Sequence, residues 1–139
     1  MIILIGRFFL QYSNMPKSIT QVTIGTTTVE VEVADTDASR ERGLSYRDVL
    51  LLGHGMLFVF QIPGTYGFWM KDMHFPLDII FADSNGIIVT IERDATPESY
   101  EKDPPDVFYP ASPISYVLEV PAGFAKEHGI AEGDKFVLQ

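Results

Sequence analysis

The sequence predicts an α+β fold, in which a mainly antiparallel β-sheet carries two short helices and can curl toward a barrel. Apolar and polar residues alternate over short stretches, which is typical of strands with one solvated face. Turn residues recur between these stretches, and only two segments have the capped, polar character of a short surface helix. The 139 residues, 46% of them hydrophobic and 21% charged, match one globular domain.

A hairpin and a helix open the predicted domain. Residues 19–24 and 29–33 alternate between apolar and polar side chains, and Gly25 can make the turn between them. A helix over residues 36–42 follows, because a threonine or an aspartate at its start can cap it and Gly43 can end it. The helix should lie on the surface.

The middle of the chain predicts more strands. Residues 56–60 form an unbroken apolar run, which favours a strand covered on both sides. Residues 68–81 should form two strands around a polar corner at 71–76. An Asn-Gly pair then predicts a two-residue primed turn, which would pair 77–82 with 87–92 as an antiparallel hairpin. The remaining elements are a proline-rich loop over 93–112, a strand over 115–120, a short helix over 122–129 and a last strand over 135–138.

The domain is predicted to span residues 16–139, preceded by an apolar segment over residues 1–15. This segment is too short to cross a bilayer and lacks a clear basic region or cleavage site, so it is either a tail or a degenerate export signal. We therefore favour a cytoplasmic location over export. Membrane association is expected only through residues 1–12.

Charge and cysteine content limit the partners. The formal net charge of −9 repels nucleic acid phosphates, so no nucleic acid partner is expected. The absence of cysteine excludes thiolate metal sites and thiol nucleophiles. No cofactor is expected, because the glycines at 53 and 55 lack the rest of a phosphate-binding motif.

Two acidic residues stand inside apolar strands, where an unpaired charge is costly. Strand alternation places Asp78 on the same face as Ile80, and Glu119 on the same face as Val117. The cations nearest to a predicted element come just after the first strands. We therefore expect Arg40 or Arg47 to form a partly buried ion pair with Asp78 or Glu119, which would fasten the first helix to the sheet.

The corner at residues 71–76 holds the remaining candidate groups. Asp72, His74 and Asp78 could converge on a divalent ion, or serve a metal-dependent or carboxylate-dependent hydrolase. Their spacing is not a specific metal motif, so they are weak candidates and no metal is expected. Asp78 and Glu119 could also act as a pair of acids, as in glycosidases, although no local catalytic signature accompanies them.

A binding site agrees better with the residue types. Aromatic side chains offer flat amphipathic surfaces, and a few polar groups can orient a small molecule or a glycan on them. The candidate ligand-binding residues are Arg47, Trp69, Asp72, Asp78, Tyr109 and Glu119.

Several blocks of sequence, taken together and in order, resemble the domain-of-unknown-function 192 family over Val22 to Leu138. They are Ala34-Asp35-Thr36 with Arg40, Gly43-Leu44 and Arg47; Gly55-Met56-Leu57-Phe58; Phe68-Trp69-Met70; Pro76-Leu77-Asp78-Ile79-Ile80-Phe81; and Leu118-Glu119-Val120-Pro121-Ala122-Gly123. The resemblance implies a compact β-rich domain of bacteria and archaea, often exported in bacteria, without an established biochemical function. The chain departs from the family pattern at Ser45, Asp72 and Met73, where members usually carry Met and an Asn-Thr pair.

The sequence thus predicts a small, non-enzymatic ligand-binding or interaction domain with an aromatic and acidic site, and the hydrolase described above is the alternative.

Overall fold

The structure, a computed structural model, describes residues 18–139. The predicted apolar tail or export signal over residues 1–15 lies outside the described residues. Within the described part of the chain, no helix is long and apolar enough to cross a membrane.

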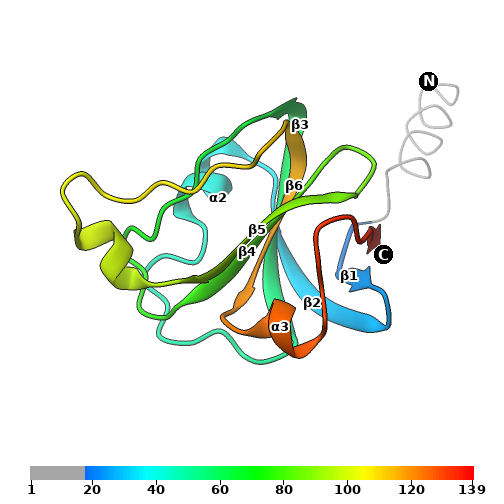
Figure 1. The fold of residues 1–139 in the computed structure, drawn as a ribbon, viewed down its shortest axis with the longest axis horizontal. Helices are drawn as coiled ribbons and strands as arrows, with labels where there is room; N and C mark the ends of the chain where they lie inside the picture. Colours follow the sequence, from blue (N-terminus) through cyan, green and yellow to red (C-terminus); the bar gives the residue numbers. More distant parts are fainter. Residues whose placement is uncertain (1–17) are drawn as a thin grey trace, which may run out of the picture.

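Seven strands form one sheet in the order β5-β4-β6-β3-β2-β1-β7 (Figure 1). Every neighbouring pair is antiparallel except β2 and β3, which run parallel. The predicted α+β class is therefore confirmed. The strands are β1 (Gln21–Ile24), β2 (Thr27–Ala34), β3 (His54–Gly64), β4 (Leu77–Ala82), β5 (Ile88–Ala95), β6 (Ile114–Pro121) and β7 (Phe136–Leu138). The helices are α2 (Asp37–Arg42), α3 (Phe124–Glu127) and a 3-10 helix, η1 (Pro97–Glu101), in the proline-rich loop.

The sheet is a half-barrel, because its two edges approach each other at one end. The amide of Phe136 donates to the carbonyl of Gly86 at 2.7 Å, and the amide of Ile88 donates to the carbonyl of Asp134 at 2.8 Å. These bonds join the start of β5 to the segment that leads into β7. The expected curl of the sheet follows from them.

Each face of the sheet has its own apolar core. On one face Ile80, Leu118 and Val120 pack with Phe124 of α3. On the other face Ile79, Val117 and Phe58 pack with Leu44, which follows α2. The alternation of β4 and β6 therefore sends neighbouring side chains into separate cores.

Two local predictions are wrong. The turn between β4 and β5 is not a two-residue primed turn, because Ser84 and Asn85 lack the positive φ that it needs and only Gly86 has it, at 81°. Asp83 shapes this turn by accepting the amides of Asn85 and Ile87 at 2.9 and 3.0 Å. The strand predicted to start at residue 68 is also missing, since residues 66–70 form only an isolated bridge between Phe68 and Phe108.

Candidate functional site

A cavity of about 710 Å³ opens between α2, the end of β3 and the loop over residues 66–73. Its walls combine aromatic rings with charged groups. The aromatic lining residues are Tyr46, Phe58, Phe60, Tyr66, Phe68 and Trp69. The charged lining residues are Arg40, Glu41, Arg42, Lys71, Asp72 and Glu119.

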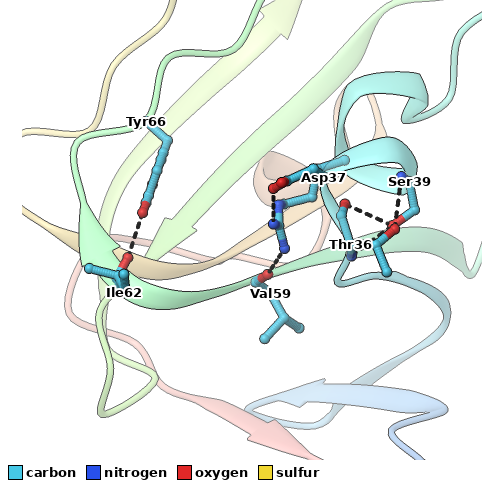
Figure 2. A network of polar contacts seen from close by, with 7 residues as sticks. Thr36, Asp37, Ser39, Val59, Ile62 and Tyr66 are labelled. Atoms are coloured by element: carbon cyan, nitrogen blue, oxygen red, sulfur yellow. Dashed lines mark hydrogen bonds and ion pairs between the residues drawn. The ribbon is translucent and has the colours of Figure 1, made fainter.

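The α2 side of the cavity is fixed by a capping box and by Arg40. Thr36 and Ser39 exchange side-chain to backbone hydrogen bonds at 3.1 and 3.0 Å, which starts the helix (Figure 2). Arg40, the residue after Ser39, donates to the carbonyl of Val59 at 2.8 Å and pairs with Asp37 at 2.7 Å. These contacts hold the short helix against β3.

Ring packing builds the wall formed by β3 and the loop after it. Phe60 and Tyr66 stack at 3.9 Å between ring centroids, and the Tyr66 hydroxyl donates to the Ile62 carbonyl at 2.6 Å (Figure 2). Phe68 meets Phe58 edge-on at 5.0 Å. The rings are therefore fixed relative to one another before any ligand arrives.

Trp69 stands half-exposed at the rim of the cavity. Its ring meets Tyr100 of η1 edge-on at 5.3 Å, and the Lys71 ammonium lies 5.8 Å from the ring centroid. A half-exposed tryptophan with a cation above it is an available contact surface rather than a core residue.

Two residues in strained backbone conformations join the two loops of the rim. Tyr46 and Asp72 have φ angles of 67° and 57°, in the left-handed region that non-glycine residues rarely occupy. The Tyr46 amide donates to the Asp72 carbonyl, and the Tyr46 hydroxyl donates to the Asp72 carboxylate, both at 2.9 Å. That hydrogen bond and the carboxylate charge raise the pKa of the exposed Tyr46 phenol, so it stays protonated at neutral pH.

Glu119 forms the floor of the cavity. It lies on β6 between Met56 of β3 and Ile79 of β4, and only 5% of the residue is exposed. Among the described residues, no side chain or backbone group forms a hydrogen bond or ion pair with its carboxyl group. No fully buried side-chain oxygen in this part of the chain lacks a partner, so the Glu119 oxygens are reached by solvent from the cavity. Burial raises the pKa of this carboxyl group to about 8, so at neutral pH Glu119 is mainly a neutral carboxylic acid facing the cavity.

Three of the predicted ligand-binding residues meet at this cavity: Trp69, Asp72 and Glu119 line it. Arg47, Asp78 and Tyr109 do not. Tyr109 packs outside the lining, where a side chain on Gly67 would come within 2.7 Å of its ring. Tyr46 and Tyr66, which the sequence also offers as aromatic surfaces for a ligand, line the cavity as well. Phe58, Phe60, Phe68 and Lys71 were not predicted, although the alternate phenylalanines at 58 and 60 lie on one face of a strand and were a usable signal.

Asp78 is buried on the opposite face of the sheet and serves the fold. Its carboxylate accepts the amides of Asp94 at 2.9 Å, Gly123 at 3.2 Å and Ala125 at 2.9 Å. It therefore ties β4 to a bulge in β5 and to the start of α3. Because Ile79, not Asp78, is the cross-strand neighbour of Glu119, the two acids cannot act as a glycosidase pair across one site.

The predicted ion pair between the arginines and the buried acids is wrong. Arg47 forms a bidentate pair with Glu32 at 2.7 and 2.8 Å, and Arg40 is paired with Asp37. The pair with Arg47 lowers the pKa of Glu32. Arg40 thus pairs with an acid of its own helix, and Arg47 reaches from a loop to Glu32 of β2, while Asp78 accepts hydrogen bonds from backbone amides instead.

The three candidate metal ligands also have separate environments. Asp72 bonds to Tyr46, Asp78 bonds to three amides, and His74 lies 3.6 Å from Asp48. Between residues 18 and 139, no group of three or more His, Cys, Asp or Glu side chains is placed to hold a metal ion.

Comparison with known structures identifies similar proteins in two bacteria. A protein from Sinorhizobium meliloti 1021, described as a "putative transcription regulator", is 34% identical, with 89% of this chain and 98% of that chain covered and a TM-score of 0.79. A protein of unknown function from Novosphingobium aromaticivorans DSM 12444 is 33% identical, with 86% and 84% covered and a TM-score of 0.78. A comparison with curated proteins gave no match.

A family model covers nearly all of the described residues. The model is DUF192, described as "Uncharacterized ACR", and it matches residues 20–138. This range includes every strand of the half-barrel and every residue that lines the cavity. The chain therefore belongs to the DUF192 family.

Proposed function

We propose that this protein is a small-molecule-binding domain, without catalytic activity, whose ligand occupies the cavity beside α2. One observation carries the proposal: Glu119, a residue that is only 5% exposed and whose carboxyl group has no bonded partner among the described residues, forms the floor of an aromatic-walled cavity of about 710 Å³. Binding pockets for small molecules commonly enclose roughly 300–1,000 Å³ and combine apolar walls with a few oriented polar groups.

The strained contact between the two rim loops supports this proposal. Left-handed conformations at residues such as Tyr46 and Asp72 carry a cost of about 1–3 kcal/mol each and persist where surrounding contacts enforce them. Here the contacts are hydrogen bonds that fix the mouth of the cavity. A pre-formed mouth reduces the entropy that a ligand loses on binding.

Two other functions have less support. A hydrolase that uses Asp72, His74 and Asp78 would need these side chains in one site, whereas each is bonded to different groups. One similar protein is described as a "putative transcription regulator", but direct DNA binding by this chain would have to overcome a formal charge of −9. We therefore propose a small molecule or a glycan, not a nucleic acid, as the partner.

A panel of small ligands tests the proposal. Primary amines, carboxylic acids, carboxamides and monosaccharides are added in turn, and binding is followed by ligand-observed NMR and by the melting temperature, which a native-state ligand must raise. We expect at least one class to bind saturably to the wild type. Trp69→Ala should weaken this binding, while Leu52→Ala, a truncation at an 84% exposed residue outside the cavity, should leave it unchanged.

Either of two results would refute the small-molecule function. The first is that no member of the panel binds. The second is that binding is unaffected by Trp69→Ala, which would place the ligand elsewhere on the protein.

A further inference from the structure

We propose that the ligand of this cavity is an organic cation, whose ammonium or guanidinium group pairs with Glu119 and whose apolar part lies against the rings of Phe58, Phe60 and Phe68. The inference rests on the proposed function and names the chemical class of its ligand. It assigns to Glu119 the role of the charge-pairing group.

Among residues 18–139, the Glu119 carboxyl group has no hydrogen-bond or ion-pair partner. Buried carboxylates in proteins are normally paired with cations or with several hydrogen-bond donors, because an isolated charge is poorly stabilised away from water. Asp78 meets this rule with three amides, whereas Glu119 on the other face has none among the described residues. The carboxyl group faces the cavity, so a ligand can supply the partner.

Aromatic rings line the same cavity as the Glu119 carboxyl group. The faces of aromatic rings carry partial negative charge and attract cations within about 6 Å. Two of the rings in this cavity already have a cation near them: the Arg40 guanidinium lies 5.2 Å from the centroid of Phe60, and the Lys71 ammonium lies 5.8 Å from Trp69. Rings and an acid together form a site for a positive group on an apolar body.

Three cations, Arg40, Arg42 and Lys71, line the cavity with Glu119, but none of them forms an ion pair with it. Arg40 is bonded to Asp37 and to the Val59 carbonyl, and Arg47 is bonded to Glu32. Among the residues from 18 onward, no cation lies within 4 Å of the Glu119 carboxyl group. A positively charged ligand would therefore supply the counter-ion of Glu119.

The charged and titratable groups around Glu119 come from several elements. On its own face of the sheet, Glu32 of β2, His54 of β3 and Glu92 of β5 lie in neighbouring strands, and Asp78 of β4 points to the opposite face. Arg40, Glu41 and Arg42 approach from α2, and Tyr46, Tyr66, Lys71 and Asp72 approach from the loops. The strand neighbours that lie directly beside Glu119, Met56 and Ile79, are apolar.

This arrangement couples cation binding to a proton. Burial holds the pKa of Glu119 at about 8 in the free protein, so at pH 7 the acid must lose its proton before it can pair with a cation. Each cation bound below that pKa therefore releases about one proton, and the apparent affinity should rise about tenfold per pH unit until the pKa is reached.

Benzylamine is a suitable probe, because it is a compact aromatic ammonium ion over the relevant pH range, and benzyl alcohol is its neutral counterpart. Binding to the full chain is measured by calorimetry at pH 6, 7 and 8, in buffers that differ in ionisation enthalpy. We expect the affinity for benzylamine to rise with pH, with release of about one proton on binding. Benzyl alcohol should bind at least tenfold more weakly than benzylamine at pH 8.

Glu119→Gln should remove the pH dependence and lower the affinity for benzylamine at least tenfold. Glu127→Gln, the same change at an exposed residue of α3, should alter neither.

The outcomes separate this inference from the proposed function. If acids, amides or sugars bind in a Trp69-dependent manner while benzylamine does not, the cavity is a binding site but the cation assignment is wrong. Binding of benzylamine that is equal in wild type and Glu119→Gln would also overturn the assignment. A second measurement does not depend on the variant: the titration of the Glu119 carboxyl carbon by NMR should move to lower pH when benzylamine is added, and an unchanged titration would contradict the pairing.

Discussion

Two buried acids on adjacent strands have different surroundings, and the difference lies in which face of the sheet each side chain reaches. Asp78 points toward α3 and accepts three backbone amides. Glu119 points toward the aromatic cavity and has no bonded partner among the described residues. Burial alone therefore does not distinguish the two acids, whereas their hydrogen bonds do. This difference is the reason we propose a ligand-binding role for Glu119 and a structural role for Asp78.

The structural role of Asp78 predicts a large loss of stability on substitution. Asp78→Ala leaves three buried or partly buried amides without an acceptor, and each unsatisfied group costs about 1–3 kcal/mol. We expect the free energy of unfolding, measured in urea, to fall by at least about 3 kcal/mol. Asp35→Ala, at an exposed position, should change it by less than about 0.5 kcal/mol. A loss below about 1 kcal/mol for Asp78→Ala would mean that the three bonds do not support the fold.

The raised pKa of Glu119 predicts a specific pH dependence of stability. The unfolded chain releases this proton near pH 4.5, while the folded protein keeps it until about pH 8. The folded state binds more protons over this range, so stability should fall as pH rises from 4.5 to 8, and the full difference corresponds to about 5 kcal/mol.

Glu119→Gln isolates this effect, because the variant lacks the titrating group but keeps its shape. Urea denaturation of both proteins between pH 5 and 9 should show the variant gaining stability relative to the wild type as pH rises, and the difference should level off above pH 8. A constant difference across the range would show that Glu119 titrates normally.

At the residue scale the sequence placed the acids correctly but not their partners. Alternation along the strands put Asp78 with Ile80 and Glu119 with Val117, as the two cores confirm. It could not show that Arg47 reaches Glu32, because that pairing depends on the path of a loop. The sequence also could not show that amides from the β5 bulge and from the start of α3 converge on Asp78. Backbone amides are present at almost every residue, so their hydrogen bonds cannot be predicted from residue types.

At the scale of elements, the short helix α2 is a wall of the site that depends on its cap. A six-residue helix has few internal hydrogen bonds, so the capping box of Thr36 and Ser39 carries an unusual share of its stability. The cavity should therefore respond to changes at Thr36, although this side chain is not part of the lining.

Thr36→Ala removes the cap. We expect a loss of about 1 kcal/mol in the free energy of unfolding and faster amide hydrogen exchange in residues 39–43, with exchange in β4 changed much less. Thr26→Ala in the exposed β1–β2 turn is the matched control. Unchanged exchange in α2 would show that Arg40 alone holds the helix in place.

Most elements follow from sequence pattern, and the exceptions have physical causes. Alternation and turn residues correctly predicted the hairpins, both helices and the long loop, within a few residues. Residues 66–70 have the aromatic content of a strand, yet Phe68 bridges to Phe108 and Gly67 lies close beneath the ring of Tyr109. That packing against a distant loop replaces regular strand pairing.

At the scale of the whole molecule, the two faces of the half-barrel are covered to different extents. One face is sealed by α3 and anchored by Asp78. The other is covered only in part, by α2 and the loop over residues 66–73, and the incomplete cover leaves the cavity. The sequence could identify Trp69, Asp72 and Glu119 as candidates, but it could not predict that they line one cavity. That prediction requires the relative positions of segments 50 residues apart, which only the three-dimensional fold gives.

The central claim is that this cavity binds a small organic cation, and chemical-shift mapping tests it most directly. Benzylamine is titrated at pH 8 into the ¹⁵N-labelled chain, which has one tryptophan and therefore one indole N–H signal. We predict saturable shifts at the Trp69 indole and at amides in residues 43–46 and 68–72, all lost in Glu119→Gln. Saturable shifts confined to the α3 face, or no shifts at all, would contradict the claim.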